Sequence, residues 1–394
     1  MIYLDNSATT PVKKEVMDEM IPYFTEIYGN PSSLYKLSRD TKRNLEDARE
    51  RVAKLLGAEK DEIYFTASGT ESDNWAIKQL ARANKKKGNH IITTKIEHHA
   101  ILHACEEMEK EGFEVTYLEV DSEGKISLDD LIKSIKDETI LITIMYANNE
   151  IGSIMPIPEI GKIAREKGIT FHTDAVQAVG KLNIDVKKEN IDMLSLSGHK
   201  FNGPRGIGVL YIRKGIKINS FMHGGGQERG KRAGTENVPG IMGLAKAFEI
   251  SMENREEKNK KSVELRDYLI ERVLNEIPYS ILNGHRTDRL PNNANFCFRF
   301  IEGESLLLAL DNFGICASSG SACTSGSLDP SHVLLAIGLP HEIAHGSLRL
   351  SLSDETTKEE IDFTIEKLKS VVERLRNMSP LWEDFVRNGG KDNV

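Results

Sequence analysis

The chain has 394 residues, of which 39% are hydrophobic and 28% are charged, as is usual for a globular protein with a sizeable core. Its formal charge is -8 and it has no basic block, which argues against binding to nucleic acid or to an anionic membrane. The apolar stretches are too short to span a bilayer and the N-terminus does not resemble a secretion signal, so we expect a cytoplasmic protein.

The length predicts about two domains. The four cysteines, Cys105, Cys297, Cys316 and Cys323, contain no CxxC pair. This usage fits a reducing compartment, and it argues against a disulfide framework or a cysteine zinc site.

The N-terminal residues 1–11 read as a short arm. Helical spacing follows over residues 12–28 and ends at the turn signal Gly29-Asn30-Pro31, and a second amphipathic helix is expected over 42–56.

The first stretch that could bind a ligand lies between a strand at 62–66 and a helix at about 71–84. Between them stand Ala67, Ser68, Gly69 and Thr70, and unpaired amides at a helix start beside small and hydroxyl residues can form a phosphate cradle. The alternative is a capping box, formed by Ser68 with Glu71 or by Thr70 with Asp73, that binds nothing.

A further strand and helix meet at Glu97-His98-His99. A histidine at the carboxyl end of a strand can stack on a cofactor ring or transfer a proton. His99 and His103 stand four residues apart, a spacing that suits a metal, but no third ligand is evident and a solvated helix face explains the pair.

Strands are expected at 139–147, 169–175, 191–197 and 208–215, and they alternate with helices, which indicates a parallel sheet with crossover helices. Polar residues follow the strands at a common edge, where ligands of such sheets bind: Thr70, His98, Asn149, Asp174 and Lys200. A lysine and an aspartate placed in this way suit pyridoxal 5'-phosphate (PLP), because the lysine forms an imine and the acid keeps the ring nitrogen protonated. Taken alone, the two residues also fit a turn aspartate and a surface lysine.

Residues 221–240 form a glycine-rich loop with a basic centre, which suits an anion or a mobile connection. A long helical stretch at 241–277 contains an expected domain boundary near Glu253, where the alternation of strands and helices stops. The last third reads as a smaller α/β domain, with strands at 295–300 and 348–352 and helices at 305–312 and 358–377.

Cys323 lies in a run of Ser, Gly, Ala and Thr, where it is expected to be exposed and available as a nucleophile. Further on, His341 to His345 spell the zinc-peptidase motif HExxH, with Glu366 as a possible third ligand. A strand-like stretch follows at once, whereas that motif needs one continuous helix, so the context disfavours a zinc peptidase.

A series of motifs follows along nearly the whole chain: LDNSATTP, GNPSS, TESDN, EHH, NNEIG, HTDAVQ, SLSGHK, GPRGIG, GGGQERGKRAGT, SSGSAC and SLRLSL. In this order they resemble the class I cysteine desulfurases of the NifS/IscS type. The resemblance implies an α/β protein with the PLP-dependent transferase fold type I, in which a large domain carries a mainly parallel seven-stranded sheet and a smaller α/β domain follows. We expect an arm at 1–13 that packs with the small domain, a PLP-binding domain at 14–253 and the small domain at 254–394.

The resemblance also implies residue roles. Lys200 matches the lysine that forms the Schiff base, Asp174 the partner of the pyridine nitrogen and His98 the ring-stacking histidine. Cys323 matches the nucleophile that becomes a persulfide, and Arg349 the arginine that binds the substrate carboxylate. The remaining matches are Asn149 and Gln177 at the phenolic oxygen, Gly69, Thr70, Ser197 and His199 at the phosphate, Thr235 from the other subunit, and Asn30 on the substrate side.

The implied reaction converts L-cysteine to L-alanine in a homodimer and passes the sulfur to an acceptor, such as an iron-sulfur scaffold of the IscU/NifU kind. The chain departs from the family pattern at Tyr35 and Ser38, at Ser353 to Glu355, and in a tail that ends at Val394 without the longer extension that IscS proteins use for scaffold docking. Two other hypotheses remain: a selenocysteine lyase with the same fold, and a PLP-fold binding or regulatory protein.

Overall fold

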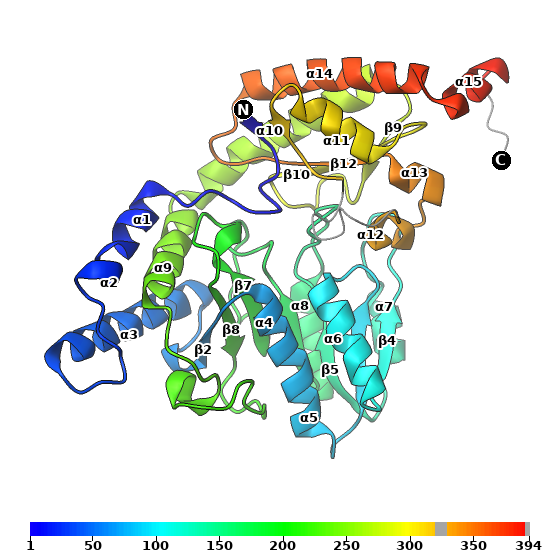
Figure 1. Cartoon of the computed structure of the whole chain (residues 1–394). Helices are drawn as coiled ribbons and strands as arrows, with labels where there is room; N and C mark the ends of the chain where they lie inside the picture. Colours follow the sequence, from blue (N-terminus) through cyan, green and yellow to red (C-terminus); the bar gives the residue numbers. More distant parts are fainter. Residues whose placement is uncertain (320–328, 391–394) are drawn as a thin grey trace.

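The computed structural model describes residues 1–319 and 329–390 (Figure 1). Cys323, the predicted nucleophile, lies outside the described residues. The main feature is a seven-stranded sheet with the strand order β2-β8-β7-β6-β5-β3-β4. Its strands are β2 (Ile63–Thr66), β8 (Gly208–Ile212), β7 (Met193–Ser197), β6 (Thr170–Asp174), β5 (Thr139–Thr143), β3 (His90–Thr94) and β4 (Glu114–Leu118).

Neighbouring strands of this sheet run parallel, except that β8 is antiparallel to β2 and β7. Apolar side chains cover both faces: Ile92 and Ile142 belong to one hydrophobic cluster, and their neighbours Ile91 and Leu141 belong to another. Such strands are typical of sheets with helices on both sides. The predicted fold, α/β with a mainly parallel seven-stranded sheet, is confirmed.

Helices of the first two thirds of the chain cover this sheet or lie beside it (Figure 1). They are α1 (Lys14–Met20), α2 (Pro22–Thr25), α3 (Lys36–Leu56), α4 (Gly69–Asn74), a π-helical turn (Trp75–Gln79), α5 (Leu80–Asn84), α6 (His99–Lys110), α7 (Leu128–Ser134), α8 (Ile157–Lys167) and α9 (Val238–Met252). Of these, α1 and α2 lie to one side of the sheet and contact α9.

A second, antiparallel sheet is built from β9 (Ser280–Asn283), β10 (Asn293–Phe298) and β12 (Ser347–Ser351), in the order β12-β10-β9. The N-terminal strand β1 (Ile2–Tyr3) pairs in parallel with β11 (Ile315–Cys316). The helices of this part are α10 (Arg255–Glu276), α11 (Gly303–Asp311), α12 (His332–Ala336), α13 (His341–His345), α14 (Lys358–Asn377) and α15 (Pro380–Arg387). Leu4 packs with Leu269, Phe296 and Leu350 in one cluster, so the N-terminus joins this second core.

Two predicted helix limits are wrong. The helix expected over 12–28 ends at Met20, and α2 starts at Pro22, because proline lacks the N–H that a continuing helix needs. The helix expected from 42 begins at Lys36 and ends where Gly57 adopts a left-handed conformation (φ +71°). The break between α9 and α10 falls at Glu253 and Asn254, the position predicted for a boundary, while the division into domains stays a prediction.

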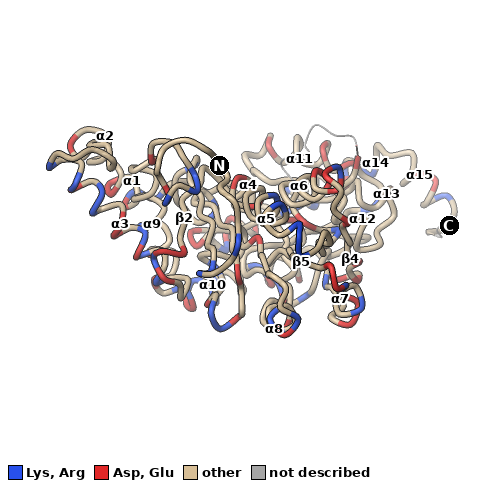
Figure 2. The backbone as a smooth tube through the Cα atoms, turned by 90° about the horizontal axis from the view of Figure 1, so that it is seen from below, with Lys and Arg blue, Asp and Glu red and all other residues tan. Residues whose placement is uncertain are grey.

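Charged residues of both signs alternate along helices such as α3 and α8, so neither helix has a uniformly basic face (Figure 2). Among the described residues, no helix is long and apolar enough to cross a membrane.

Candidate active site

A cavity of about 200 Å³ lies at the carboxyl edge of the large sheet. It brings together most of the predicted site residues, which come from five strand ends and from β12: Gly69, Thr70, His98, Asn149, Asp174, Gln177, Ser197, His199, Lys200 and Arg349. The cavity is also lined by residues that were not predicted as site residues, among them Ser7, Ala8 and Asp73. The prediction that strand ends meet at one edge is therefore confirmed for this set.

Lys200 stands at the end of a short 3₁₀ turn, Gly198–Lys200, directly after β7. Its Nζ donates hydrogen bonds to the carbonyl oxygens of Ser7 (2.6 Å) and Ala8 (3.0 Å). The N-terminal arm thus reaches into the cavity and holds the lysine amine.

Asp174 is the last residue of β6 and is buried. Burial raises its pKa to about 6, while the backbone N–H of Val176 (2.9 Å from Oδ1) and the charge of Lys200 act in the opposite direction. The carboxyl group is therefore mainly ionised at neutral pH. The Val176 N–H and Lys200 stabilise its charge, which burial alone would disfavour.

His98 caps the N-terminus of α6, and its Nδ1 accepts a hydrogen bond from the backbone N–H of Ala100 (3.1 Å). Burial and then the charge of Lys200 lower its pKa to about 4. The imidazole is neutral at physiological pH, and because Nδ1 is an acceptor, the ring proton sits on Nε2.

At the start of α4, Ser68 Oγ accepts a hydrogen bond from the N–H of Glu71 (3.1 Å), so one of the capping interactions considered from the sequence is present. The first turn of a helix leaves other N–H groups without intrahelical partners, and Gly69 and Thr70 border the cavity. A Cβ on Gly69 would lie 2.7 Å from Val176 Cγ2, so only glycine allows this close approach. Capping and anion binding can therefore coexist here.

Arg349 on β12 is fully buried. Its Nη2 donates to Asp5 Oδ1 (2.9 Å) and its Nη1 to the carbonyl of Asn149 (3.0 Å), while its Nε has no hydrogen-bond partner among the described residues. Gln177 is similar, since its Nε2 donates to Ser7 O (3.0 Å) and its Oε1 is buried without a partner in the described part of the chain. Unpaired buried polar atoms at a cavity are typical of a site for a polar ligand.

Two predicted residues do not join the cavity. Asn30 is exposed, and its side chain accepts a hydrogen bond from the N–H of Ser32 (2.9 Å). Thr235 is also exposed and lines a different cavity, together with Glu228 and Arg232.

Asp73 on α4 was considered from the sequence only as a capping residue, and it is instead a buried acid of the cavity wall. Its Oδ1 lies 3.8 Å from His172 Nε2 and has no hydrogen-bond partner among the described residues. Burial first, and the charge of Asp174 second, raise its pKa well above the usual value. The sequence signal that might have found it is a carboxyl group one helical turn beyond the predicted phosphate cradle.

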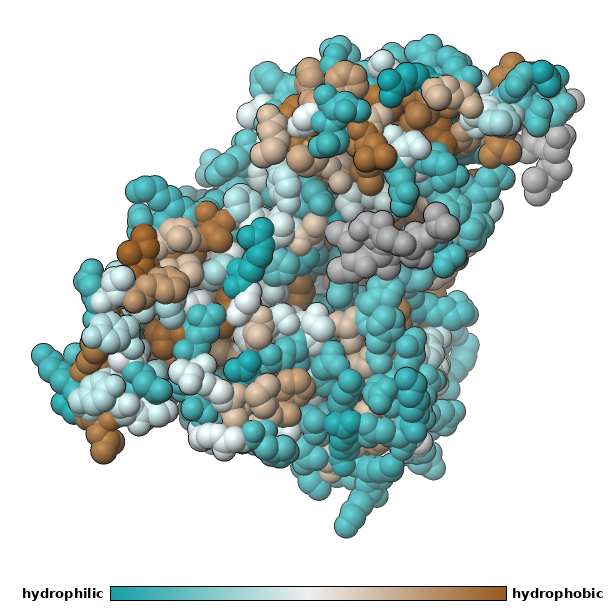
Figure 3. All heavy atoms as spheres, in the orientation of Figure 1, coloured by the Kyte–Doolittle hydropathy of each residue, from teal (hydrophilic) through white to brown (hydrophobic). Residues whose placement is uncertain are grey.

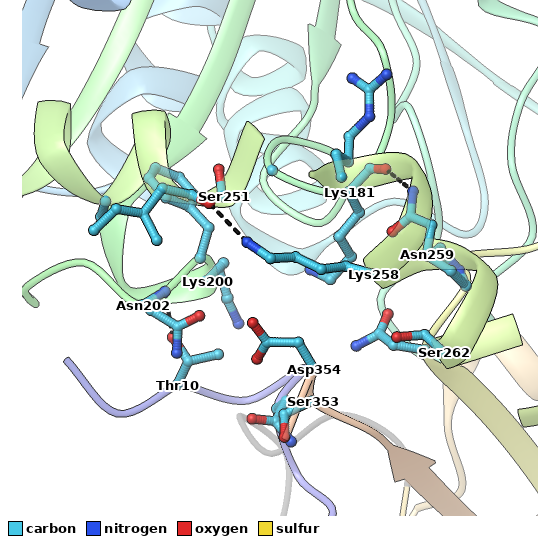
Figure 4. A pocket seen from close by; sticks show the side chains of 18 of the residues that line it. Thr10, Lys181, Lys200, Asn202, Ser251, Lys258, Asn259, Ser262, Ser353 and Asp354 are labelled. Atoms are coloured by element: carbon cyan, nitrogen blue, oxygen red, sulfur yellow. Dashed lines mark hydrogen bonds between the residues drawn. The ribbon is translucent and has the colours of Figure 1, made fainter. Parts of the chain in front are cut away.

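A second cavity, of about 90 Å³, lies behind Lys200 between α9, α10 and the N-terminal arm (Figure 4). Its charged groups contact other parts of the protein: Lys258 Nζ donates to Ile250 O (2.9 Å), Lys181 Nζ to Gln177 O (3.2 Å), and Lys13 forms an ion pair with Asp354 (2.7 Å). These contacts make the second cavity a polar crevice of the fold. Most of the predicted site residues line the first cavity instead.

The HExxH helix α13 ends at His345, and β12 begins two residues later. Glu366, on α14, forms an ion pair with Lys367 and is highly exposed. His99 and His103 face each other, with ring centroids 5.2 Å apart. Within residues 1–319 and 329–390, no group of three His, Cys, Asp or Glu side chains is arranged to hold a metal ion.

Known proteins are similar to this chain in sequence and in structure. Residues 2–363 match the family model described as aminotransferase class-V. The chain is 61% identical, over 98% of its own length and 98% of the relative, to a protein of Clostridium botulinum described as cysteine desulfurase IscS. Among solved structures it is similar to a NifS-like protein (TM-score 0.90, 40% identity, covering 95% of this chain and 100% of that one) and to SspA in complex with cysteine (TM-score 0.80, 38% identity, 91% and 100%).

Proposed function

Because the chain belongs to the class V aminotransferase family, and within it to the cysteine desulfurases of the NifS/IscS type, we propose that it uses PLP held at Lys200 to remove sulfur from L-cysteine. The products are L-alanine and a persulfide on Cys323, from which the sulfur passes to an acceptor. The observation that supports this proposal most is that Lys200, Asp174 and His98 line a single buried cavity.

The residues of the cavity fit PLP. Lys200 supplies the amine for the cofactor aldehyde, Asp174 a carboxylate for the ring nitrogen, and His98 a neutral ring for stacking. Ser197, His199, Gly69 and Thr70 would hold the phosphate, and Asn149 and Gln177, which line the same cavity, would contact the phenolic oxygen. When bound, PLP supplies an electron sink that makes the Cα proton of cysteine acidic and its sulfur electrophilic.

Asp174 contributes by keeping a negative charge where the ring nitrogen must hold a proton. Its ionised form is stabilised by the Val176 N–H and by Lys200, and it dominates above about pH 6. His98 holds its own proton on Nε2 and, with a pKa of about 4, adds no positive charge beside Lys200. Lys200 carries an amine at this cavity, which could also serve as the base for the Cα proton of the substrate.

Arg349 is the proposed partner of the substrate carboxylate. In the structure its Nη2 holds Asp5 Oδ1, and its buried Nε has no hydrogen-bond partner in the part of the chain that the structure describes. Binding of cysteine would replace the Asp5 contact by a carboxylate of the substrate, so the N-terminal arm is coupled to substrate binding.

We place a second subunit beside α1 and α2. Six large side chains are exposed in and next to these helices: Met17, Ile21, Phe24, Tyr28, Leu34 and Tyr35. Brown, hydrophobic residues gather over the region of α1 and α2 in Figure 3. Exposed apolar surface of this extent marks an interaction site. Thr235 lies away from the cavity of its own chain, as expected of a residue that serves the partner's phosphate site. A homodimer accounts for both features, and a soluble iron-sulfur scaffold or another sulfur acceptor completes the proposed set of partners.

The visible spectrum tests the assignment of Lys200. The purified protein should be yellow, and Lys200→Ala should abolish the absorption band that the lysine-bound cofactor gives. Lys181→Ala is a matched control, because Lys181 lines only the second cavity. A colourless wild-type protein after incubation with PLP, or equal spectra for the wild type and Lys200→Ala, would contradict the proposal.

A further inference from the structure

We infer that Thr10 of the N-terminal arm is a positioning residue for Lys200: its hydroxyl bridges the residue before the lysine and the residue two positions after it, and so fixes the turn on which the amine stands. The inference rests on the proposed function, because it takes Lys200 as the lysine that holds the cofactor. It adds a role for a residue that the predicted site does not contain.

Three hydrogen bonds join Thr10 to this turn. The carbonyl oxygen of His199 accepts two of them, from the Thr10 N–H (3.0 Å) and from Thr10 Oγ1 (2.8 Å). Because a carbonyl oxygen can only accept, the Thr10 hydroxyl donates its proton there and keeps its lone pairs for the third bond, from the N–H of Asn202 (2.8 Å). Figure 4 shows Thr10 and Asn202 together near Lys200, where all three line the second cavity.

The turn needs this support because its backbone is irregular. Strand β7 ends at Ser197 and the 3₁₀ turn ends at Lys200, so neither element extends to Asn202. Asn202 has a φ of +65°, in the left-handed region, which asparagine adopts more readily than most residues but which still costs free energy. Without the Thr10 hydroxyl, the Asn202 N–H would lose this partner, and the turn would lose a bond that holds it in this conformation.

The bridge is shielded from water and stiff. Thr10 is buried, and a hydrogen bond lost from a buried group costs more than one lost at the surface. Threonine is branched at Cβ, which restricts rotation about χ1 and keeps Oγ1 between its two backbone partners.

The same arm also receives the lysine amine, whose Nζ donates to the carbonyl oxygens of Ser7 and Ala8. The arm therefore fixes Lys200 at both ends, the backbone through Thr10 and the amine through Ser7 and Ala8. An amine displaced by a fraction of an ångström reacts more slowly with a bound carbonyl group. Loss of the bridge should therefore lower the rates that depend on Lys200, while the affinity for L-cysteine, assigned to Arg349, should change little.

Thr10→Val keeps the shape of the side chain and removes the hydroxyl, so it tests the bridge directly. When cofactor-free protein is mixed with PLP, the visible band should grow about tenfold more slowly than in the wild type. In the loaded enzyme, kcat should fall by about the same factor, and the KM for L-cysteine should stay within about twofold. Thr10→Ser restores the hydroxyl and should bring both rates to within about threefold of the wild type.

Thr364→Val is the matched control. Thr364 is also buried, and its Oγ1 donates to the carbonyl oxygen of Glu360 (2.7 Å) within α14. This variant should leave both rates within about twofold of the wild type. Equal losses of rate in Thr10→Val and Thr364→Val would mean that the rates report general stability. Unchanged rates in Thr10→Val would mean that the turn holds Lys200 without the bridge. Either result overturns the inference.

Hydrogen–deuterium exchange measures the bridge in the cofactor-free protein. The Asn202 amide should exchange about tenfold faster in Thr10→Val than in the wild type, and at the wild-type rate in Thr364→Val. If Thr10→Val fails to fold, the wild type decides: protection of the Asn202 amide supports the bridge, and exchange at the rate of an unstructured chain overturns it. A wild type that shows protection but gives no visible band with PLP would contradict the proposed function and leave the bridge in place.

Discussion

Arg349 Nη2 lies 2.9 Å from Asp5 Oδ1, although the two residues are 344 positions apart in the chain. The arginine that we assign to the substrate carboxylate is therefore already paired with an acid of the N-terminal arm. Cysteine must compete with Asp5 for this guanidinium, and this competition leads to the first prediction.

Asp5→Asn should lower the KM for L-cysteine by roughly three- to tenfold, because it removes a competing negative charge from Arg349. Arg349→Ala should raise the KM by roughly a hundredfold, since it removes the carboxylate partner itself. Steady-state alanine production measures both values.

The matched control for Asp5→Asn is Asp354→Asn, which removes the other ion pair of the arm, with Lys13. It should leave the KM within about twofold. An unchanged KM in Asp5→Asn would mean that Arg349 does not exchange partners, and an equal fall in the control would mean that the arm acts through its general docking.

The pKa of Asp174, about 6 in the folded protein, predicts how stability depends on pH. A buried acid with a raised pKa stabilises the fold while it is protonated, and this contribution disappears as the pH rises from about 3.8 through about 6. The cofactor-free Asp174→Asn protein should therefore gain stability relative to the wild type as the pH rises from 5 to 8, by about 1.4 kcal/mol. Thermal unfolding at both pH values measures the difference. If the stability difference between the two proteins were the same at pH 5 and at pH 8, Asp174 would not titrate in this pH range.

The glycine-rich loop depends on a buried ion pair. Glu228 accepts hydrogen bonds from Arg49 Nη1 (2.7 Å), Arg49 Nη2 (2.8 Å) and the backbone N–H of Phe65 (2.9 Å). Glu228→Ala removes the buried partner of Arg49 and leaves the guanidinium with the more exposed Glu46 (Nε to Oε1, 3.3 Å), so it should reduce the free energy of unfolding by about 3 kcal/mol. Urea denaturation measures this loss.

Glu383→Ala provides the comparison, because Glu383 forms an exposed ion pair with Arg387 on α15. Glu383→Ala should reduce the free energy of unfolding by less than about 1 kcal/mol. Similar losses of stability for the two variants would argue against a stabilising role of the buried Glu228–Arg49 ion pair in the glycine-rich loop.

The dimer surface is tested by placing a charge in the apolar region of α1 and α2. Phe24→Asp should convert a dimer into a monomer at micromolar concentration, since Phe24 is 61% exposed and a charge there would oppose burial in an apolar interface. Light scattering measures the mass. Leu381→Asp on α15, where the leucine is 52% exposed, should leave the dimer intact. A wild-type monomer, or dissociation by Leu381→Asp alone, would place the interface elsewhere.

The sequence predicted those site residues whose position follows from the succession of strands along the chain. Lys200, Asp174 and His98 each lie at or just after the end of a strand, and parallel strands bring their ends together, so their common cavity could be inferred from strand positions. The chemistry of each residue type then indicated the cofactor.

The sequence did not predict the contacts that depend on tertiary packing. The pairing of Asp5 with Arg349 joins distant segments, and no local pattern indicates it. Asp73 has the spacing of an ordinary capping residue, and only the fold reveals that it is buried in the wall of the cavity that Asp174 also lines. The wrong helix over 12–28 has a different cause, because apolar spacing continues past Pro22 although the proline itself ends α1.

The central claim is that the sulfur of L-cysteine moves to Cys323 of this chain. Mass spectrometry of the purified protein after incubation with L-cysteine tests it directly, with Cys323→Ser as the control. We predict one additional sulfur atom on the Cys323 peptide and the appearance of L-alanine, with neither product at the wild-type level in the control. Alanine without sulfur on Cys323, or sulfide release by Cys323→Ser at the wild-type rate, would contradict the account.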